Sequence, residues 1–377
     1  MNTSLLKIAA LSALLTSSAS AASYVVNLTG STAFRSSTHS AILANLTSPT
    51  YAYTDKASNG LNKAKFVIFK GTIGADDYTI RCSWSGSVEG VVDTGSQNSI
   101  AALPTTQSTA TAPGTALVNS NENTFATDTM IPDGGMSDVF QSSTSETGAL
   151  TDKIVAVVPF VFIANNGTVG VTNMTPQIFR TVYGPGGAPL SILTGNPADN
   201  ATYVFGVGRD IGSGTRATTM AETGYGIFTA PAQYTVTVGT STWSAADLVS
   251  QSATSGYTSG STMATDLAKA SSDGSVCVGY VGVADKNVNN VELTYCGATY
   301  SAANVYNGNY TFWGYEHLFT PSRVSTATTG DDLARKNFFN SMAATLASAP
   351  GAAGLNPALM QVHRDGDGAT VLEGPLP

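Results

Sequence analysis

The sequence predicts an α/β protein of two lobes, built on mixed, mostly parallel sheets. The chain has 377 residues, more than one hydrophobic core usually supports, so two lobes are expected. Apolar runs of strand length alternate with helix-like segments along most of the chain. This order is typical of parallel strands that are joined by crossover helices.

The composition indicates an exported, strand-rich protein. Hydrophobic residues make up 42% of the chain and charged residues only 11%, and Ser, Thr, Asn and Gly supply much of the remaining polarity. The formal net charge is −8 and no segment is rich in Lys or Arg, so nucleic acid is excluded as a partner. An anionic ligand would need donors placed locally, because the overall charge repels it.

The first 21 residues have the pattern of a secretory signal. Lys7 is followed by the apolar stretch Ile8–Leu15 and by the small-residue cleavage site at Ala19–Ala21. The apolar stretch is too short to span a bilayer, and no later stretch approaches eighteen continuous apolar residues. No cysteine follows the signal, so no site for a lipid anchor is expected there. The mature chain is therefore expected in the periplasm or outside the cell, without a transmembrane segment.

Alternation and apolar runs place the strands and helices. The expected strands lie at 23–31, 64–73, 77–87, 153–167, 201–208 and 276–284. The expected helices lie at 32–47, 175–184, from 212 onward and at 331–347. Thr175 is expected to cap the second of these helices and Asp331 the last one.

Residues 92–135 are rich in Thr, Ser, Asn and Gly, with scattered Pro. This composition offers little apolar surface to bury, so the segment is interpreted as a long surface insertion in the first lobe rather than as a domain.

Three cysteines, Cys82, Cys277 and Cys296, leave two alternatives open. Cys277 and Cys296 belong to neighbouring strand-like runs, and a hairpin of these runs would let them form a disulfide, which can persist outside the cytosol. Otherwise all three are unpaired thiols that are buried as small apolar groups.

Three strand–glycine–helix junctions are candidate anion sites. They contain Gly30-Ser31-Thr32, Ser85-Gly86-Ser87 and Gly212-Ser213-Gly214-Thr215. Helix N-termini present unpaired N–H groups and a partial positive charge, although each junction alone is more often an ordinary capped helix. Arg209, just before the third junction, matches a tetrahedral oxyanion bidentately. Its alternative is a surface ion pair with Asp210 or another carboxylate.

Motifs of enzymes, metals and cofactors are not found. The histidines His39, His317 and His363 are scattered without metal-ligand spacing, and the Asp-Gly-Asp-Gly tail is interpreted as a plain turn. There is no nucleophile elbow, no phosphate-binding-loop lysine and no dinucleotide fingerprint. The sequence therefore predicts a protein that is not an enzyme and holds neither a metal nor a cofactor.

An ordered set of motifs resembles the periplasmic phosphate-binding proteins of bacterial ABC transporters. "RDIGSGT" is similar to that family's Arg-x-x-Gly-Ser-Gly-Thr signature, "LTGSTAF" to its first strand and loop, and "GSVEGV" to its serine–glycine turn. "GGMSDVFQ", "TPQIFRTVYG", "VGYVGVADKN" and "NVYNGNYTFWGYEHLFT" resemble further segments, in order, over residues 24–345. The chain departs from the pattern where Asp210 follows Arg209 directly and where no proline follows Phe34.

The resemblance implies a two-lobed fold of the periplasmic-binding-protein type, with phosphate in the cleft between the lobes. It implies residues 22–162 and 286–377 as lobe I and residues 163–285 as lobe II. The residues that it implies as ligand contacts are Ser31, Thr32, Ala33, Phe34, Ser87, Asp138, Arg209, Ser213, Gly214 and Thr215. Asp138 would accept the proton that phosphate carries and sulfate lacks.

The function expected from this resemblance is the binding of inorganic phosphate for uptake or scavenging, with an ABC transporter permease as a candidate partner. Two alternatives remain open. One is a cell-surface or structural protein of the same fold whose oxyanion binding is lost or altered, and the other is a secreted phosphatase on this scaffold.

Overall fold

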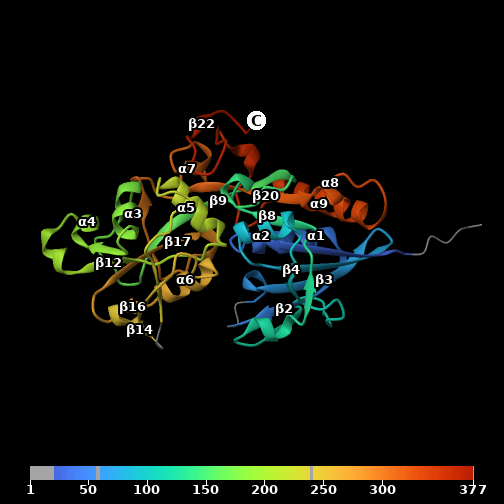
Figure 1. The fold of residues 1–377 in the computed structure, drawn as a ribbon, viewed down its shortest axis with the longest axis horizontal. Helices are drawn as coiled ribbons and strands as arrows, with labels where there is room; N and C mark the ends of the chain where they lie inside the picture. Colours follow the sequence, from blue (N-terminus) through green and yellow to red (C-terminus); the bar gives the residue numbers. More distant parts are fainter. Residues whose placement is uncertain (1–20, 57–59, 238–240, 377) are drawn as a thin grey trace, which may run out of the picture.

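The computed structural model describes residues 21–56, 60–237 and 241–376. The expected signal segment, 1–21, lies outside these residues except for Ala21. Figure 1 shows two lobes side by side, joined along one side.

One large sheet runs through both lobes. In spatial order its strands are β11 (Gly187–Pro189), β12 (Tyr203–Gly206), β17 (Val276–Gly282), β9 (Leu150–Ala164), β20 (Trp313–Pro321), β8 (Gly134–Ser137), β1 (Ser23–Gly30), β4 (Asp76–Ser83), β3 (Phe66–Ile73), β2 (Thr47–Asp55) and β6 (Thr115–Val118), with β18 (Val291–Glu292) also on β9. The smaller strand pairs are β5 (Ile100–Ala102) with β7 (Asp128–Met130), β10 (Asn173–Met174) with β19 (Thr294–Tyr295), β13 (Tyr234–Val236) with β15 (Leu248–Ser250), β14 (Thr242–Trp243) with β16 (Ala270–Ser271), and β21 (Val362–His363) with β22 (Leu372–Glu373).

Helices cover the sheet in both lobes. The α-helices are α1 (Arg35–Asn45), α2 (Ser87–Gly95), α3 (Pro176–Tyr183), α4 (Ser191–Thr194), α5 (Gly214–Glu222), α6 (Gly260–Leu267), α7 (Ala302–Tyr306), α8 (Ser322–Ser325) and α9 (Gly330–Ser348). The short 3₁₀ helices are η1 (Leu61–Lys63), η2 (Glu122–Phe125), η3 (Gln141–Ser143), η4 (Pro197–Ala201), η5 (Ala245–Asp247), η6 (Val283–Asp285) and η7 (Pro357–Leu359). Among the helices of the described ranges, none has the length and apolar composition that crossing a bilayer requires.

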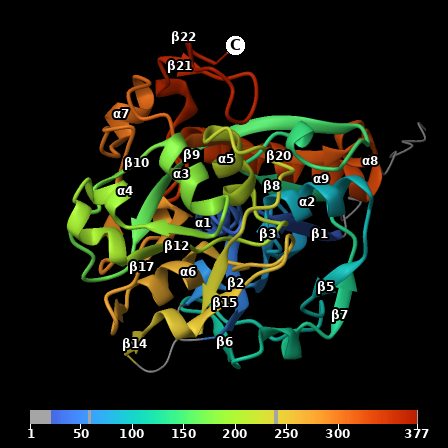
Figure 2. The same cartoon turned by 60° about the vertical axis from the view of Figure 1, so that its left-hand side comes forward.

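The predicted two-lobed α/β fold is confirmed. One lobe holds β1 to β4 and β8 with α1, α2, α8 and α9, and the other holds β12 and β17 with α3, α4 and α6 (Figure 1). Figure 2 shows α5 and α2 near each other in the middle of the molecule, where the lobes meet. The junctions that the sequence marks as anion sites are therefore brought to this boundary.

Strand β9 crosses from one lobe to the other. Its residues from Val155 to Ala164 are buried, as expected for a continuous β-branched and aromatic run. It pairs with β20 as far as Pro159 and with β17 from Phe160 onward. Pro159 lacks an N–H group and lies where the partner strand changes, a position at which a ladder tolerates proline.

The direction of the strands differs in part from the prediction. The sheet is mixed, but antiparallel neighbours prevail over parallel ones in it. The crossing strand β20 runs antiparallel to both β8 and β9, and β3 and β4 form a hairpin. The β3–β4 hairpin needs no crossover helix, and between β9 and β20 the chain passes through the whole of the other lobe, so the rule for parallel strands applies to neither pair.

The segment 92–135 is more structured than a surface loop. It includes the end of α2, the pair β5–β7, the edge strand β6 and the start of β8. Leu103 is buried with Ala52, Phe66 and Ile68 on the sheet, and Phe125 packs on the same cluster. A few apolar residues spaced among Thr and Ser are thus enough to cover one face of β2 and β3.

Two local expectations about caps have different outcomes. Thr175 caps α3, because its hydroxyl accepts a hydrogen bond from the Ile178 amide at 3.2 Å. The prediction that Asp331 caps the last helix is wrong. Thr329 is the N-cap of α9, since Gly330 already begins the helix, and Asp331 lies in the first turn near the positive end of the helix dipole.

The three cysteines are unpaired. Cys277 is buried in β17, whereas Cys296 is exposed beyond β19. The proposed hairpin does not form, because β17 and β18 both pair with β9 at Ala164 and Ile163 and therefore lie on opposite sides of it.

Candidate anion site between the lobes

Three strand-to-helix junctions meet where the lobes touch. They lead from β1 into α1, from β4 into α2, and from β12 into α5. The Gly86 amide donates to the Gly30 carbonyl at 3.0 Å, which ties the first two junctions together. The amides of Val88 and Glu89 donate to the Gly212 carbonyl at 3.0 and 3.4 Å, which ties α2 to the loop before α5. The N-terminal ends of these helices are thereby held close to one another.

Glycine is required at two of these turns. Gly30 has φ +114°, and a Cβ there would lie 1.9 Å from the Met136 carbonyl oxygen. Gly86 has φ +122°, and a Cβ there would lie 2.5 Å from the Gly212 carbonyl oxygen. Both values exclude ordinary side chains, so the motifs "TGS" and "SGS" allow the close approach of the junctions.

Arg209 is buried, with 1% of its surface exposed. Its Nε donates to the Tyr257 carbonyl at 2.9 Å, and its Nη2 donates to the Thr258 carbonyl and to Thr32 Oγ1, both at 3.2 Å. Nη1 has no hydrogen-bond partner. Over the described part of the chain Arg209 forms no ion pair, so the alternative of a surface pair with Asp210 is wrong.

Asp138 follows β8 and is also buried, with 1% exposed. Its Oδ2 accepts a long hydrogen bond from Thr215 Oγ1 at 3.5 Å, whereas its Oδ1 has no partner. A Cβ on Gly214 would lie 1.6 Å from Asp138 Oδ1 and 2.6 Å from Ser87 Oγ, so these groups lie side by side. Burial raises the pKa of Asp138, and the Ser87 hydroxyl and the Arg209 charge act against this rise.

All ten residues that the sequence motifs single out are buried at this boundary, namely Ser31, Thr32, Ala33, Phe34, Ser87, Asp138, Arg209, Ser213, Gly214 and Thr215. Contacts join Thr32 with Arg209, and Asp138 with Ser87, Gly214 and Thr215.

Four of these residues have further structural contacts. The Ser213 hydroxyl caps α5 by accepting from the Arg216 amide at 3.2 Å, as an ordinary helix cap does. The Phe34 amide donates to Ser31 Oγ at 3.2 Å. The Ala33 methyl group would lie 3.2 Å from a Cβ on Gly282.

Three charged residues at the boundary were not singled out from the sequence. Glu316 on β20 is fully buried, and neither of its carboxyl oxygens has a hydrogen-bond partner. Burial raises its pKa well above the usual value, with Asp138 adding to the rise and Ser31 opposing it. Arg35, at the start of α1, and Asp285, at the end of η6, are buried as well. A carboxyl group within the mainly aromatic and apolar run "FWGYEHLF" is the signal that could have revealed Glu316.

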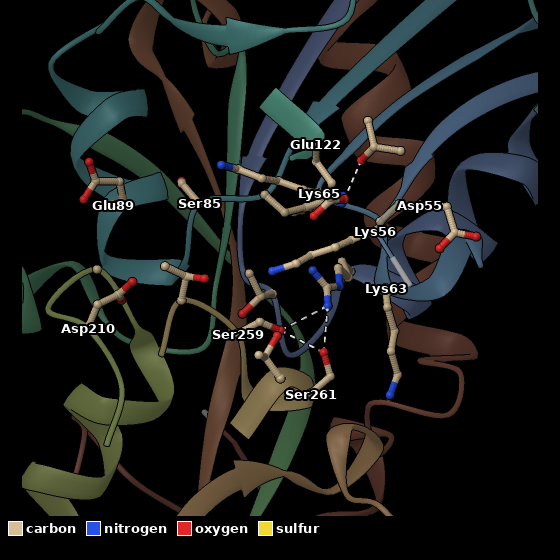
Figure 3. Close-up of a pocket in the computed structure, with 18 of the residues that line it drawn as sticks. Asp55, Lys56, Lys63, Lys65, Ser85, Glu89, Glu122, Asp210, Ser259 and Ser261 are labelled. Atoms are coloured by element: carbon tan, nitrogen blue, oxygen red, sulfur yellow. Dashed lines mark hydrogen bonds between the residues drawn. The ribbon is translucent and has the colours of Figure 1, made fainter. Parts of the chain in front are cut away.

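A cavity of about 410 Å³ lies beside these residues (Figure 3). Its wall includes Thr32 and Arg35 from one lobe, and Asp210, Ser259 and Ser261 from the other. Thr32 also accepts a hydrogen bond from Arg209, so one residue belongs both to the cavity wall and to the buried cluster.

The donors and acceptors of the cluster suit a small anion that still carries a proton. Guanidinium, hydroxyl and helix N-terminal groups can donate, and Asp138 supplies one unpartnered carboxylate oxygen that can accept. Groups of three or more His, Cys, Asp and Glu that could hold a metal ion do not occur among the residues described by the structure. In the tail, Asp367 instead accepts hydrogen bonds from the Phe140 amide and the Ser143 hydroxyl, at 2.9 and 2.6 Å.

The chain is similar to phosphate-binding proteins of known structure. A candidate phosphate ABC transporter substrate-binding protein from Clostridium perfringens, solved with bound phosphate, is 15% identical with a TM-score of 0.48 over 84% of this chain and 92% of that one. An ABC-type phosphate transport receptor from Vibrio cholerae is 14% identical with a TM-score of 0.46 over 87% and 98% of the two chains. A phosphate-binding protein from Stenotrophomonas maltophilia is 11% identical with a TM-score of 0.39 over 89% and 98%.

Comparison by sequence finds no matching family model and no matching curated protein. A structural likeness at these identities and TM-scores does not assign a ligand. The chemistry of the boundary residues therefore has to support the function.

Proposed function

We propose that the protein is an exported solute-binding protein that holds inorganic phosphate between its two lobes for uptake or scavenging. The observation that carries this proposal is the pair of buried, incompletely satisfied groups, Arg209 and Asp138. Arg209 has a free Nη1 and Asp138 a free Oδ1, and neither forms an ion pair in the described structure. Buried polar groups without partners are costly, and a bound anion would satisfy both.

The two groups together favour a protonated oxyanion. Arg209 attracts a tetrahedral anion bidentately, whereas Asp138 accepts a hydrogen bond only from an anion that still carries a proton. Phosphate near neutral pH carries such a proton and sulfate does not. Leaving the buried acceptor unpaired costs about 1–3 kcal/mol, so the site would reject sulfate without any difference in shape.

We further propose that residues 22–162 and 286–377 move as lobe I and residues 163–285 as lobe II, with the crossing strands as the hinge. The change of partner of β9 at Pro159 supports a hinge in this region. Closing of the lobes around the anion would present it to a transporter permease. The protein would act by binding, and no chemical step on the ligand is proposed.

One observation favours the alternative, a protein of this fold whose oxyanion binding is lost or altered. The Val88 and Glu89 amides at the start of α2 are already used by the Gly212 carbonyl and would not be available to a ligand. Titration calorimetry at pH 7 separates the two functions. Saturable binding of orthophosphate with weaker or absent binding of sulfate supports the proposal, and no heat from either anion supports the alternative.

A further inference from the structure

We propose that the cavity beside the phosphate site binds a second anionic group of the same ligand, through Arg35, Lys56, Lys63 and the N-terminal N–H groups of α6. The preferred ligand is then a phosphoryl compound with two adjacent anionic groups, and orthophosphate fills only the first half of the site. This inference rests on the proposed function and specifies the class of ligand.

Arg35 is a buried guanidinium, and the buried carboxyl group of Asp285 is the acidic group that acts on it most strongly. Arg35 is 4% exposed, and its Nη2 donates to Ser259 Oγ and Ser261 Oγ at 3.3 and 3.4 Å. Its Nε has no partner, and no ion pair of Arg35 occurs in the parts of the chain that the structure describes. Burial lowers its pKa, which the charge of Asp285 opposes. Asp285 compensates this buried charge without forming an ion pair, and an anion in contact with Arg35 would compensate it further.

The turn at the start of α6 lies between Arg35 and Arg209. Arg35 bonds to the hydroxyls on either side of Gly260, while Arg209 bonds to the Thr258 carbonyl. A Cβ on Gly260 would lie 3.1 Å from Arg209 Nη1 and 2.7 Å from Asp285 Oδ2, so a carboxyl group lies at this turn as well. The two guanidinium groups therefore approach the same turn, and anions that they bind would be neighbours.

The N-terminus of α6 adds donors to the second position. Ser259 is its N-cap and makes no capping hydrogen bond from its side chain. The first N–H groups of the helix therefore remain to be satisfied, and the positive end of the helix dipole faces the same place. Together with the unpartnered Nε of Arg35, this arrangement is suited to an anion.

The charges of the cavity are unevenly distributed. In Figure 3, Glu89 and Asp210 lie at one end of the cavity, and the other end holds Lys56, Lys63 and Lys65 together with Asp55 and Glu122. Neither Lys56 nor Lys63 forms an ion pair within the described residues. The end of the cavity that holds Arg35 therefore has three lysines and two carboxyl groups.

Glu122 also lines the cavity but is already engaged. Its Oε1 accepts hydrogen bonds from Thr54 Oγ1 at 2.6 Å and from the Lys65 amide at 3.1 Å.

The cavity volume of about 410 Å³ is within the range of small-molecule sites, so the cavity admits a ligand larger than one phosphate.

Two kinds of ligand share this chemistry, a diphosphate and a phosphorylated carboxylic acid. Calorimetry with inorganic pyrophosphate and with 2-phosphoglycolate distinguishes them, and glycerol 3-phosphate supplies a substituent without a second charge. We expect pyrophosphate or 2-phosphoglycolate to bind at least tenfold more tightly than orthophosphate, and glycerol 3-phosphate to show no such gain. An equal gain for glycerol 3-phosphate would overturn the inference, because any substituent would then suffice.

Arg35→Met tests the residue that carries the inference, and Lys63→Met tests the same site at a partly exposed position that folding tolerates. We compare the affinity for pyrophosphate or 2-phosphoglycolate with the affinity for orthophosphate. In both variants we expect the ratio of these two affinities to fall at least fivefold, while Arg180→Met on the outer face of α3 keeps the ratio. A ratio that is unchanged in both variants contradicts the second position. If orthophosphate binds the wild type and pyrophosphate binds no better, this inference fails alone, and if neither binds, the proposed function fails with it.

Discussion

Arg209, which follows β12, donates a hydrogen bond from its Nη2 to Oγ1 of Thr32, which follows β1, at 3.2 Å. The two strands belong to different lobes, so this bond joins the lobes at the proposed binding site. The guanidinium keeps Nη1 free beside it, and this free donor is the group that we expect an anion to take.

Replacing Arg209 with alanine should weaken orthophosphate binding by about 2–3 kcal/mol, because a buried, charge-assisted contact is lost. Arg209→Lys should recover only part of the loss, since an ammonium cannot reproduce the planar fork. Calorimetry measures both variants, and Arg180→Ala is the control on the surface of the same lobe. Equal phosphate affinities in Arg209→Ala and the wild type would remove Arg209 from the site.

Asp138→Asn should change selectivity rather than shape. The amide can donate to an unprotonated oxygen, so sulfate should gain affinity relative to phosphate by about 1–3 kcal/mol. If Asp138 had only a structural role as a polar partner of Thr215, the amide would replace it with little effect. Competition titrations of both anions decide, and an unchanged phosphate-to-sulfate ratio would place the discrimination elsewhere.

Gly214→Ala should prevent the lobes from closing. The added methyl group would lie 1.6 Å from Asp138 Oδ1 and 2.5 Å from Ser87 Cβ, both in the other lobe. We expect loss of phosphate binding and a larger radius of gyration in small-angle X-ray scattering. Gly366→Ala is the matched control, because a Cβ there meets nothing within 4 Å. Wild-type affinity in Gly214→Ala would show that closure around this position is not needed.

Glu316 should make stability depend on pH. Burial raises its pKa well above 4.5, so above that pH the unfolded chain releases a proton that the folded protein keeps. The folded state binds more protons, and stability should therefore fall as pH rises, by up to about 1.4 kcal/mol per pH unit for this group. Glu316→Gln should remove this part of the slope in urea unfolding between pH 5 and 8. If the free energy of unfolding changed with pH in the same way in the wild type and in Glu316→Gln, Glu316 would be ionised in the folded protein.

Local motifs in the sequence were sufficient for much of the candidate site. The glycines of "TGS" and "SGS" and the arginine before "GSGT" stand in short motifs that can be recognised in the sequence, and the structure brings these segments together. Arg35 and Glu316 were missed because their importance comes from burial and from the absence of partners. Both properties arise only when distant segments pack.

The fold was predictable to a similar degree. The apolar run of β9 identified a buried strand, and the alternation of elements identified the α/β class. The direction of β20 and the separation of β17 from β18 were not predictable, because they depend on where a crossing strand returns to the sheet. The packing of Leu103 and Phe125 on β2 and β3 was hidden by the polar composition around them.

The central claim is that phosphate is held between the lobes by Arg209 and Asp138, and a crystal structure of the protein grown with orthophosphate tests it most directly. The account predicts one phosphate buried at the lobe boundary, within hydrogen-bonding distance of the Arg209 guanidinium, the Ser87 hydroxyl and Asp138 Oδ1. A closed protein with no anion at this boundary, under conditions that saturate any binding seen by calorimetry, would contradict it.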